Sequence, residues 1–297
     1  MIIVVDALNR HRFEDLLTEM HKLRARVFEG RLGWDVTVED GAERDDFDNL
    51  DPAHVIALND TGDVVGCMRL LQTTGPHMLS DVFHSILDGE PPLRNAQLWE
   101  ATRFCVDTQQ LDRGKTKNSI SYVTSEVMIG AFEYAKSAGV LDAVAVIDPV
   151  MDRVLKRSGN APYDYVGSAK PMGKVTAMAA LMDCSDTRIS QIRAFSNITH
   201  DVFTPEEAIL EVFTAAQIAN RKHEAPSGAT CIAMPKRVNS TADKSAEFSS
   251  DLSDYLTDLL QGADSAEELE ATRALTEALE TMMGHPLRQP ATVIPFN

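Results

Sequence analysis

The segment Trp99–Val106 places a carboxylate and a guanidinium, Glu100 and Arg103, inside an otherwise apolar run. Such a run is expected to form a strand near a core, where charges must be paired or used in chemistry. The segment is therefore the first candidate site. Residues three apart on a regular strand point to opposite faces, so a site shared by Glu100 and Arg103 predicts a bulge or bend near Ala101–Thr102.

Three groups upstream carry side chains that could complete the same site. They are Arg24 with Phe28 and Trp34, the carboxylates Asp45 and Asp48, and Arg69 in the apolar run 66–71. Each group also has an ordinary structural interpretation: a solvated helix residue, an aromatic side chain that fills the core, surface carboxylates, or the outward residue of an edge strand. Taken singly, these residue types leave both interpretations open.

The spacing of these residues is more specific than their types. From Leu23 the chain reads Leu-Arg-x-x-x-Phe-x-x-Arg-x-x-Trp-x-Val, then eight residues, then Asp-x-Phe-Asp, which ends at Asp48. Gly-x-x-Arg-Leu, Thr-Gly-Pro-x-Met-Leu and Trp-Glu-x-Thr-Arg-Phe follow, starting at residues 66, 74 and 99. This series resembles the signature of the acyl-homoserine-lactone synthases, the autoinducer synthases of bacterial quorum sensing. The resemblance covers about the first 105 residues closely, continues more loosely to about 185, and departs mildly at Gln72 and Thr102, where Pro and Ser are usual.

The resemblance implies an α/β protein with a three-layer αβα sandwich and a mixed sheet similar to that of the GNAT acetyltransferases. It also implies a transferase that acts on S-adenosylmethionine, as a substrate rather than a cofactor. The methionine amine attacks an acyl thioester, and the carboxylate of the same moiety then closes onto its γ-carbon and expels methylthioadenosine. The product would be an N-acyl-L-homoserine lactone.

By the same resemblance, Glu100 is the general base, which suits a reaction whose ammonium must lose a proton before it attacks. Aromatic faces attract cations, so Phe28 and Trp34 would receive the sulfonium. The resemblance further predicts catalytic roles for Asp45, Asp48, Arg69 and Arg103, either on the substrate or as mutual support, and substrate-binding roles for Arg24 and Phe104.

The acyl donor would be a thioester of acyl carrier protein or of CoA. The resemblance makes the segments 119–137 and 140–147 walls of the acyl pocket, and members that use 3-oxo chains tend to have Thr in the second of them. Residues 142–148 contain no hydroxyl side chain, so we expect a donor without a 3-oxo group. Acyl carrier protein is acidic and would need a basic surface; the candidate clusters are Arg153, Lys156, Arg157, Lys170 and Lys174, and Arg113, Lys115 and Lys117. A solvated basic face is an equal alternative.

The elements that must position these residues alternate along the first two thirds of the chain. Apolar periodicity and turn signals predict strands at 2–5, 53–59, 64–73, 97–106, 140–147 and 173–182. They predict helices at 13–27, 78–87, 119–137, 149–158 and 204–221. Residues 29–52 hold three glycines and an acidic run, so we expect a long loop with a functional role.

Composition limits the partners. With 297 residues, 44% of them hydrophobic, the chain can bury a large core, and its formal net charge of −17 disfavours nucleic acid and anionic membrane as partners. The four cysteines lack the spacing of a disulfide or metal framework, and no histidine pairing predicts a metal site. Short apolar runs and the lack of a basic leader favour a cytoplasmic protein.

We expect a catalytic domain at 1–200 and an acidic, mostly helical extension at 201–297, with a linker at about 222–247 and helices at 248–262 and 265–283. Self-association, for example as a homodimer, regulation and solubility are open roles for the extension. Two alternative functions stay open as well. One is a GNAT-like N-acyltransferase that acts on another amine with acyl-CoA, and the other is a binding protein that retains the pocket.

Overall fold

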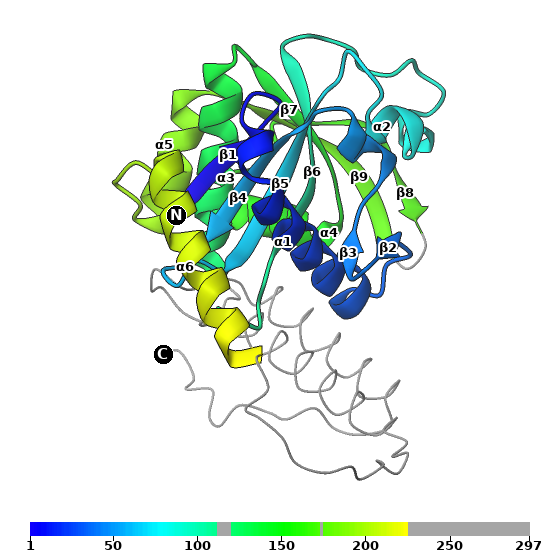
Figure 1. The fold of residues 1–297 in the computed structure, drawn as a ribbon. Coiled ribbons are helices and arrows are strands. Elements are labelled where there is room, and N and C mark those ends of the chain that lie inside the picture. Colours follow the sequence, from blue (N-terminus) through cyan, green and yellow to red (C-terminus); the bar gives the residue numbers. More distant parts are fainter. Residues whose placement is uncertain (112–119, 173–174, 225–297) are drawn as a thin grey trace, which may run out of the picture. The chain divides into compact units, whose positions relative to one another are not determined.

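The computed structural model describes residues 1–111, 120–172 and 175–224. Its centre is a seven-stranded mixed sheet (Figure 1) in which only the neighbours β6 and β7 are parallel. In spatial order the strands are β1 (Ile2–Val5), β4 (Ala53–Leu58), β5 (Val64–Gln72), β6 (Leu98–Val106), β7 (Asp142–Ile147), β9 (Val175–Asp183) and β8 (Asp164–Met172). A separate small hairpin pairs β2 (Val38–Glu39) with β3 (Ala42–Glu43).

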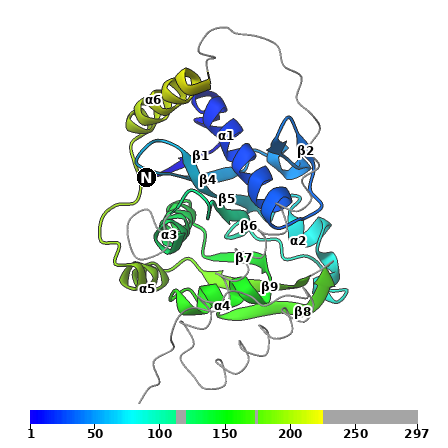
Figure 2. The same cartoon turned by 90° about the horizontal axis from the view of Figure 1, so that it is seen from below.

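Helices cover both faces of the sheet (Figure 2). One face is covered by α3 (Ile120–Ser137), α4 (Pro149–Arg157) and α5 (Asp186–Ser196), and the other by α1 (Glu14–Ala25), α2 (Met78–Asp81) and α6 (Glu206–Glu224). A π-helix, η2 (Arg26–Arg31), continues α1, and short 3-10 helices are η1 (Arg10–Arg12), η3 (Asp46–Asn49) and η4 (His84–Leu87). Because β4 and most of β5 are buried between the two helical layers, both strands are almost continuously apolar in sequence.

The three-layer αβα architecture confirms the expected fold class. The expected helix at 78–87 is instead two short pieces, α2 and η4. The expected loop at 29–52 contains η2, η3 and the β2–β3 hairpin. Two elements were not predicted: α5, and the edge strand β8, whose side chains are mostly exposed.

Helix α6 packs on the same core as α1. Ile209 and Phe213 are buried in one cluster with Leu16 and Met20 of α1, and the compact unit that contains them spans Met1–Pro226. The domain boundary expected at residue 200 therefore lies inside this unit. The expected linker beyond residue 224 and the helices at 248–262 and 265–283 lie outside the described residues.

Candidate active site

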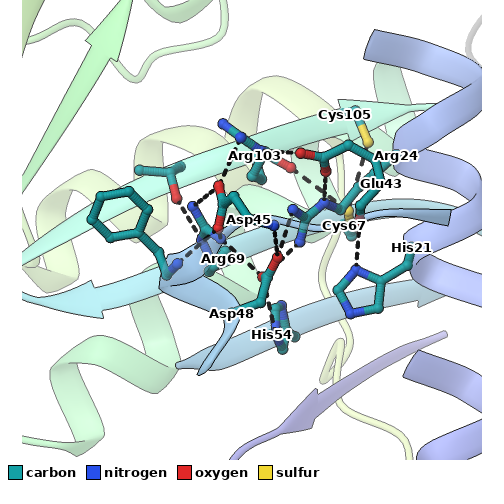
Figure 3. A network of polar contacts seen from close by, with 12 residues as sticks. His21, Arg24, Glu43, Asp45, Asp48, His54, Cys67, Arg69, Arg103 and Cys105 are labelled. Atoms are coloured by element: carbon teal, nitrogen blue, oxygen red, sulfur yellow. Dashed lines mark hydrogen bonds and ion pairs between the residues drawn. The ribbon is translucent and has the colours of Figure 1, made fainter. Parts of the chain in front are cut away.

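Segments far apart in the sequence bring six charged side chains together on the α1 face of the sheet (Figure 3). The end of α1, the β2–β3 hairpin, the loop into η3 and the central strands β5 and β6 each contribute. Three arginines and three carboxylates alternate around a closed circuit of ion pairs, which we call the charge ring; in order it is Arg24, Glu43, Arg103, Asp45, Arg69 and Asp48.

Asp48 is the most densely bonded carboxylate of the charge ring. Arg24 donates to both of its oxygens, Nη1 to Oδ1 at 2.8 Å and Nη2 to Oδ2 at 2.9 Å. Arg69 Nη1 also donates to Asp48 Oδ1 at 2.8 Å, and the backbone of Asp45 donates to Oδ2 at 2.9 Å. Burial alone would raise the pKa of Asp48, but the hydrogen bonds and charges of Arg24 and Arg69 hold it well below its ordinary value.

The other half of the charge ring centres on Arg103. Its Nε donates to Glu43 Oε1 at 3.1 Å, and its Nη2 lies 2.7 Å from Asp45 Oδ2. Asp45 in turn accepts from Arg69 Nη2 at 3.0 Å, while Arg69 Nε donates to the Thr102 hydroxyl at 3.0 Å. Thr102, the mild departure noted in the sequence, therefore accepts this hydrogen bond through its hydroxyl.

Burial divides the members of the charge ring. The side chains of Arg24, Glu43 and Arg69 are fully buried, whereas those of Asp45 and Arg103 are 19% and 12% exposed. Charges this deep require complete pairing, because an unpaired buried ion costs several kcal/mol. These three members and Asp48, which is also buried, are thus fixed by the protein, and the Asp45–Arg103 edge is the part that a ligand can reach.

The expected irregularity in β6 exists, at Arg103–Phe104 rather than at Ala101–Thr102. Between the pairs Cys67↔Cys105 and Arg69↔Thr102, β6 contains one residue more than β5, and Arg103 has a left-handed φ of 52°. This bulge turns Arg103 to the face that carries Thr102 and Glu100. Phe104 then points the other way and packs against the α3 side of the core, so the structure separates it from the charge ring.

The two aromatic candidates lie beside the exposed edge of the charge ring. Phe28 is buried in the π-helix η2, and its ring lies 5.7 Å from the guanidinium carbon of Arg103. Trp34 stacks on Phe28, with ring centres 5.1 Å apart, and is 43% exposed. The wider turn of a π-helix is often found at functional sites, and here it directs Phe28 under Arg103. The pair offers an aromatic face next to a carboxylate.

Glu100 adjoins the charge ring without pairing to it. Its carboxylate accepts the backbone N–H of Met78 at 2.7 Å and of Leu79 at 2.6 Å, at the start of α2. The Met78 sulfur lies 3.3 Å from Arg69 Nη2 and 3.5 Å from Arg103 Nη1, so Met78 joins the two groups. Complete burial raises the pKa of Glu100 to about 7, although the two N–H groups and Arg69 act in the opposite direction. A carboxyl with this pKa can exchange a proton near neutral pH.

Two buried histidines lie against the charge ring. His21 Nδ1 is 2.9 Å from the backbone oxygen of Glu43, and His54 Nε2 is 4.0 Å from Asp48 Oδ1. Burial lowers the pKa of His21 to about 4 and that of His54 to about 3, and the charge of Arg24 adds to both effects. Both imidazoles are therefore neutral at physiological pH and add no charge to the balanced ring.

Sequence reasoning did not single out Glu43, although this residue bridges Arg24 and Arg103. A signal was present. Asp40 and Gly41 both have positive φ, 51° and 75°, as a two-residue hairpin turn requires, and Asp-Gly is the dipeptide that favours such a turn. Recognising the hairpin would have placed Glu43 on a strand facing α1.

Within the described ranges, no three His, Cys, Asp or Glu side chains are grouped as a metal site requires. The helices described there are also too short or too polar to cross a bilayer.

Comparison with known proteins identifies relatives of this chain. A family model described as autoinducer synthase matches residues 8–192. The acyl-homoserine-lactone synthase of Agrobacterium fabrum is 34% identical over 191 residues, which is 64% of this chain and 90% of that protein. Among solved structures, the CoA-dependent acyl-homoserine lactone synthase MesI is 27% identical with a TM-score of 0.58, covering 68% of this chain and 98% of its own. TofI, solved with an inhibitor and MTA, is 26% identical with a TM-score of 0.53, covering 68% and 100%.

Proposed function

We propose, on the premise that this chain belongs to the autoinducer synthase family, that it makes an N-acyl-L-homoserine lactone from S-adenosylmethionine and an acyl thioester. The observation that carries the proposal is the charge ring, whose partly exposed edge, Asp45 and Arg103, adjoins the Phe28–Trp34 pair. An α-amino acid that carries a sulfonium needs an anion, a cation and an aromatic face, and this edge offers all three.

Some members of the charge ring would support the site, and others would contact the substrate. Arg24 and Arg69, fully buried and paired on both sides, hold the carboxylates in place. Asp45 would accept the substrate ammonium, and Arg103 would bind the substrate carboxylate through its guanidinium fork. Trp34, the exposed aromatic, would cover the sulfonium. The difference in burial between these residues supports this division.

Glu100 would act as the base, directly or through a water, because each of its oxygens accepts one backbone N–H and keeps a free lone pair. The ammonium loses one proton to Glu100, and its nitrogen attacks the thioester carbonyl. The nitrogen then loses a second proton, the carbon–sulfur bond of the thioester breaks, and the sulfur takes up that proton and departs as the thiol while the amide forms. A substrate carboxylate oxygen then attacks the γ-carbon. The carbon–sulfur bond breaks toward the positive sulfur and releases neutral methylthioadenosine, the compound abbreviated MTA.

The acyl thioester would enter where two strands separate. The parallel strands β6 and β7 pair at three positions only, from Leu98↔Asp142 to Glu100↔Val144, although both strands continue. Beyond this point the α3 side of β6 and β7 presents apolar side chains, among them Phe104 and Ala145, which suit a hydrocarbon chain. Phe104 would thus contact the acyl group rather than S-adenosylmethionine.

The wall that β7 supplies lacks a hydroxyl group to bind a 3-oxo oxygen, so we propose a donor without that group. Product mass spectrometry with matched donors tests this. Unsubstituted acyl-homoserine lactones should dominate, and a preference for 3-oxo donors would contradict the proposal.

The carrier is tested by comparing acyl carrier protein with CoA. The expected basic surface is partly neutralised, because Lys156 pairs with Asp152 at 2.8 Å and Lys170 with Asp88 at 2.5 Å. Arg113, Lys115, Lys117 and Lys174 lie outside the described residues. Values of kcat/KM for one acyl group on each carrier would identify the donor, and size-exclusion chromatography of the full chain would test a homodimer.

The decisive experiment measures two products together. Purified protein with S-adenosylmethionine and a panel of acyl thioesters should release methylthioadenosine and free thiol in equal amounts, and Glu100→Gln should slow the release of both by the same large factor. Thiol release with another amine and no methylthioadenosine would favour a GNAT-like N-acyltransferase. Binding of S-adenosylmethionine without release of either product would favour a binding protein.

A further inference from the structure

Arg31 belongs to the spaced motif around Arg24 and Trp34 but has no place in the charge ring. It ends the π-helix η2, and its Nη1 donates to Thr108 Oγ1 at 2.6 Å and to the backbone oxygen of Val106 at 3.2 Å. Val106 is the last residue of β6. A motif arginine therefore holds the end of the strand that carries Glu100 and Arg103.

This end of β6 is restrained by β5, where Val106 pairs with Gly66 and the Asp107 N–H donates to the Val65 oxygen at 2.8 Å, but not by β7. Among the described residues, β7 pairs with β6 only through Glu100, so the part that includes the Arg103 bulge is hydrogen-bonded on the β5 side alone. A strand with a free edge and a bulge moves more easily than an inner strand. On the side away from β5, the position of this strand then depends on the side chains that contact its end.

A second contact joins η2 to the same end. Arg26 Nη2 lies 3.2 Å from Asp107 Oδ2, while Asp107 Oδ1 accepts the backbone N–H of Gln109 at 3.0 Å. Between Arg26 and Arg31, η2 carries Phe28, which contacts Arg103. One short helix thus touches both the aromatic pair and the exit of β6.

We propose that Arg31 is a positioning residue that fixes the free edge of β6 relative to η2. It thereby aligns the acyl thioester with the bound S-adenosylmethionine. This rests on the proposed function, in which the thioester lies along that edge. Arg31 touches neither substrate; it acts through the backbone of Val106 and through Thr108.

The test compares Arg31→Met, Arg31→Lys, Thr108→Val and the double variant Arg31→Met/Thr108→Val in the full chain. Arg31→Met should raise KM for the acyl thioester about tenfold, the loss expected of a hydrogen bond to a charged group, with a smaller change in kcat. The dissociation constant of S-adenosylmethionine alone should stay within about twofold. Arg31→Lys should recover part of the loss, and Thr108→Val should add little to Arg31→Met because the two share one interaction.

Arg10→Met is the matched control, since Arg10 is an exposed arginine paired with the exposed Asp51, and it should leave both constants unchanged. Two outcomes would indicate that Arg31 has only a structural role. One is that the effects of Arg31→Met and Thr108→Val add, and the other is that affinity for both substrates falls equally together with the melting temperature. An unchanged KM in Arg31→Met would overturn the inference. These outcomes differ from failure of the proposed function, in which the wild-type protein itself releases no methylthioadenosine.

Discussion

Glu100→Gln tests the most consequential feature of the site, a carboxyl buried on the α1 face with both oxygens bonded to the start of α2. Its pKa rises from an ordinary value of 4.5 to about 7, because burial outweighs the two N–H groups of Met78 and Leu79 and the charge of Arg69. Between these two pH values the folded chain binds more protons at this position than the unfolded chain. The stability of the wild-type protein should therefore fall as the pH rises from 4.5 to 7.

The size of the change in stability follows from the interval between the two pKa values of Glu100, about 4.5 unfolded and about 7 folded. At about 1.4 kcal/mol per pH unit, the free energy of unfolding falls by roughly 3 kcal/mol across it. The amide of Gln does not titrate, but its NH₂ group faces one of the two backbone N–H groups that Glu100 accepts, which costs about 1–3 kcal/mol. At pH 5 the variant should be less stable than the wild type by that amount. At pH 8 it should be equally stable or more stable.

Denaturant unfolding of the full chain at pH 5 and pH 8, followed by the fluorescence of Trp34 and Trp99, measures the difference. Glu90→Gln, a change at an exposed glutamate, is the control and should give the same small effect at both pH values. An equal destabilisation of Glu100→Gln at pH 5 and pH 8 would show that folding does not raise the pKa of Glu100, and would refute the reasoning.

Three further predictions follow from burial and conformation. Arg24→Met leaves Glu43 and Asp48 each short of one partner, so it should lower the free energy of unfolding by about 3–5 kcal/mol in thermal or denaturant scans, against no measurable change for Arg10→Met. Trp34→Ala should weaken S-adenosylmethionine binding several-fold, measured by calorimetry, and leave the stability nearly unchanged. Phe28→Ala should instead lower the free energy of unfolding by about 3–5 kcal/mol, because Phe28 is fully packed. Equal losses of stability in the two variants would argue against a contact role for Trp34 and a packing role for Phe28. Arg103→Gly keeps a residue that tolerates the left-handed φ at this position, but it leaves Glu43 and Asp45 each without one partner. In a coupled assay the variant should release no methylthioadenosine, while its circular dichroism should stay that of a folded protein.

The activity of the wild-type enzyme should show the same titration. If Glu100 is the base, kcat/KM should rise with pH through about 7 as the carboxyl ionises. Glu100→Gln should lose this limb and retain a rate lower by a factor on the order of 100 or more. A wild-type profile that is flat between pH 6 and pH 8 would move the base to another group.

The sequence predicts the central strands well because they are buried on both faces and bounded by clear turns. The β4–β5 hairpin follows from two apolar runs around Asn59–Asp63, where the Asn59 side chain accepts the backbone N–H of Thr61 and of Asp63. The spaced motif that resembles the autoinducer synthase signature also predicts that Arg24 and Asp48 share a site. The two residues lie on different elements, a helix and a loop, so no local structure explains their spacing. Spacing alone does not say which member contacts substrate, and the contact roles proposed for Asp45 and Arg103 rest on their partial exposure.

The elements that sequence reasoning missed lack a buried face of their own. Strand β8 is an exposed edge that contains Lys170 and Pro171, residues that protect edges and do not read as a strand. It also needs Gly167, which has a φ of 65° and lies so close to the Ile86 carbonyl that no side chain fits there. Helix α5 buries few apolar residues, and its clearest signal is the cap at Ser185, whose hydroxyl accepts the Arg188 N–H.

The position of Phe104 shows that two residues adjacent in sequence need not face the same part of a site. The segment Trp99–Val106 reads as one strand, but the extra residue at the Arg103 bulge reverses the alternation beyond it. Phe104 therefore faces α3, although it is adjacent in sequence to a member of the charge ring. A bulge depends on how β6 pairs with β5, and the local sequence does not show it. The bulge could be expected only because Glu100 and Arg103 must lie on one face to share a site.

The closed circuit of the charge ring limits how this family member can diverge. Every arginine lies between two acids and every acid between two arginines, so exchanging any single member for the opposite sign puts two like charges beside it. Stepwise evolution cannot pass through such intermediates without losing the fold of this region. Descendants that change their signal molecule should therefore accumulate their differences along the apolar walls and leave these six positions as they are.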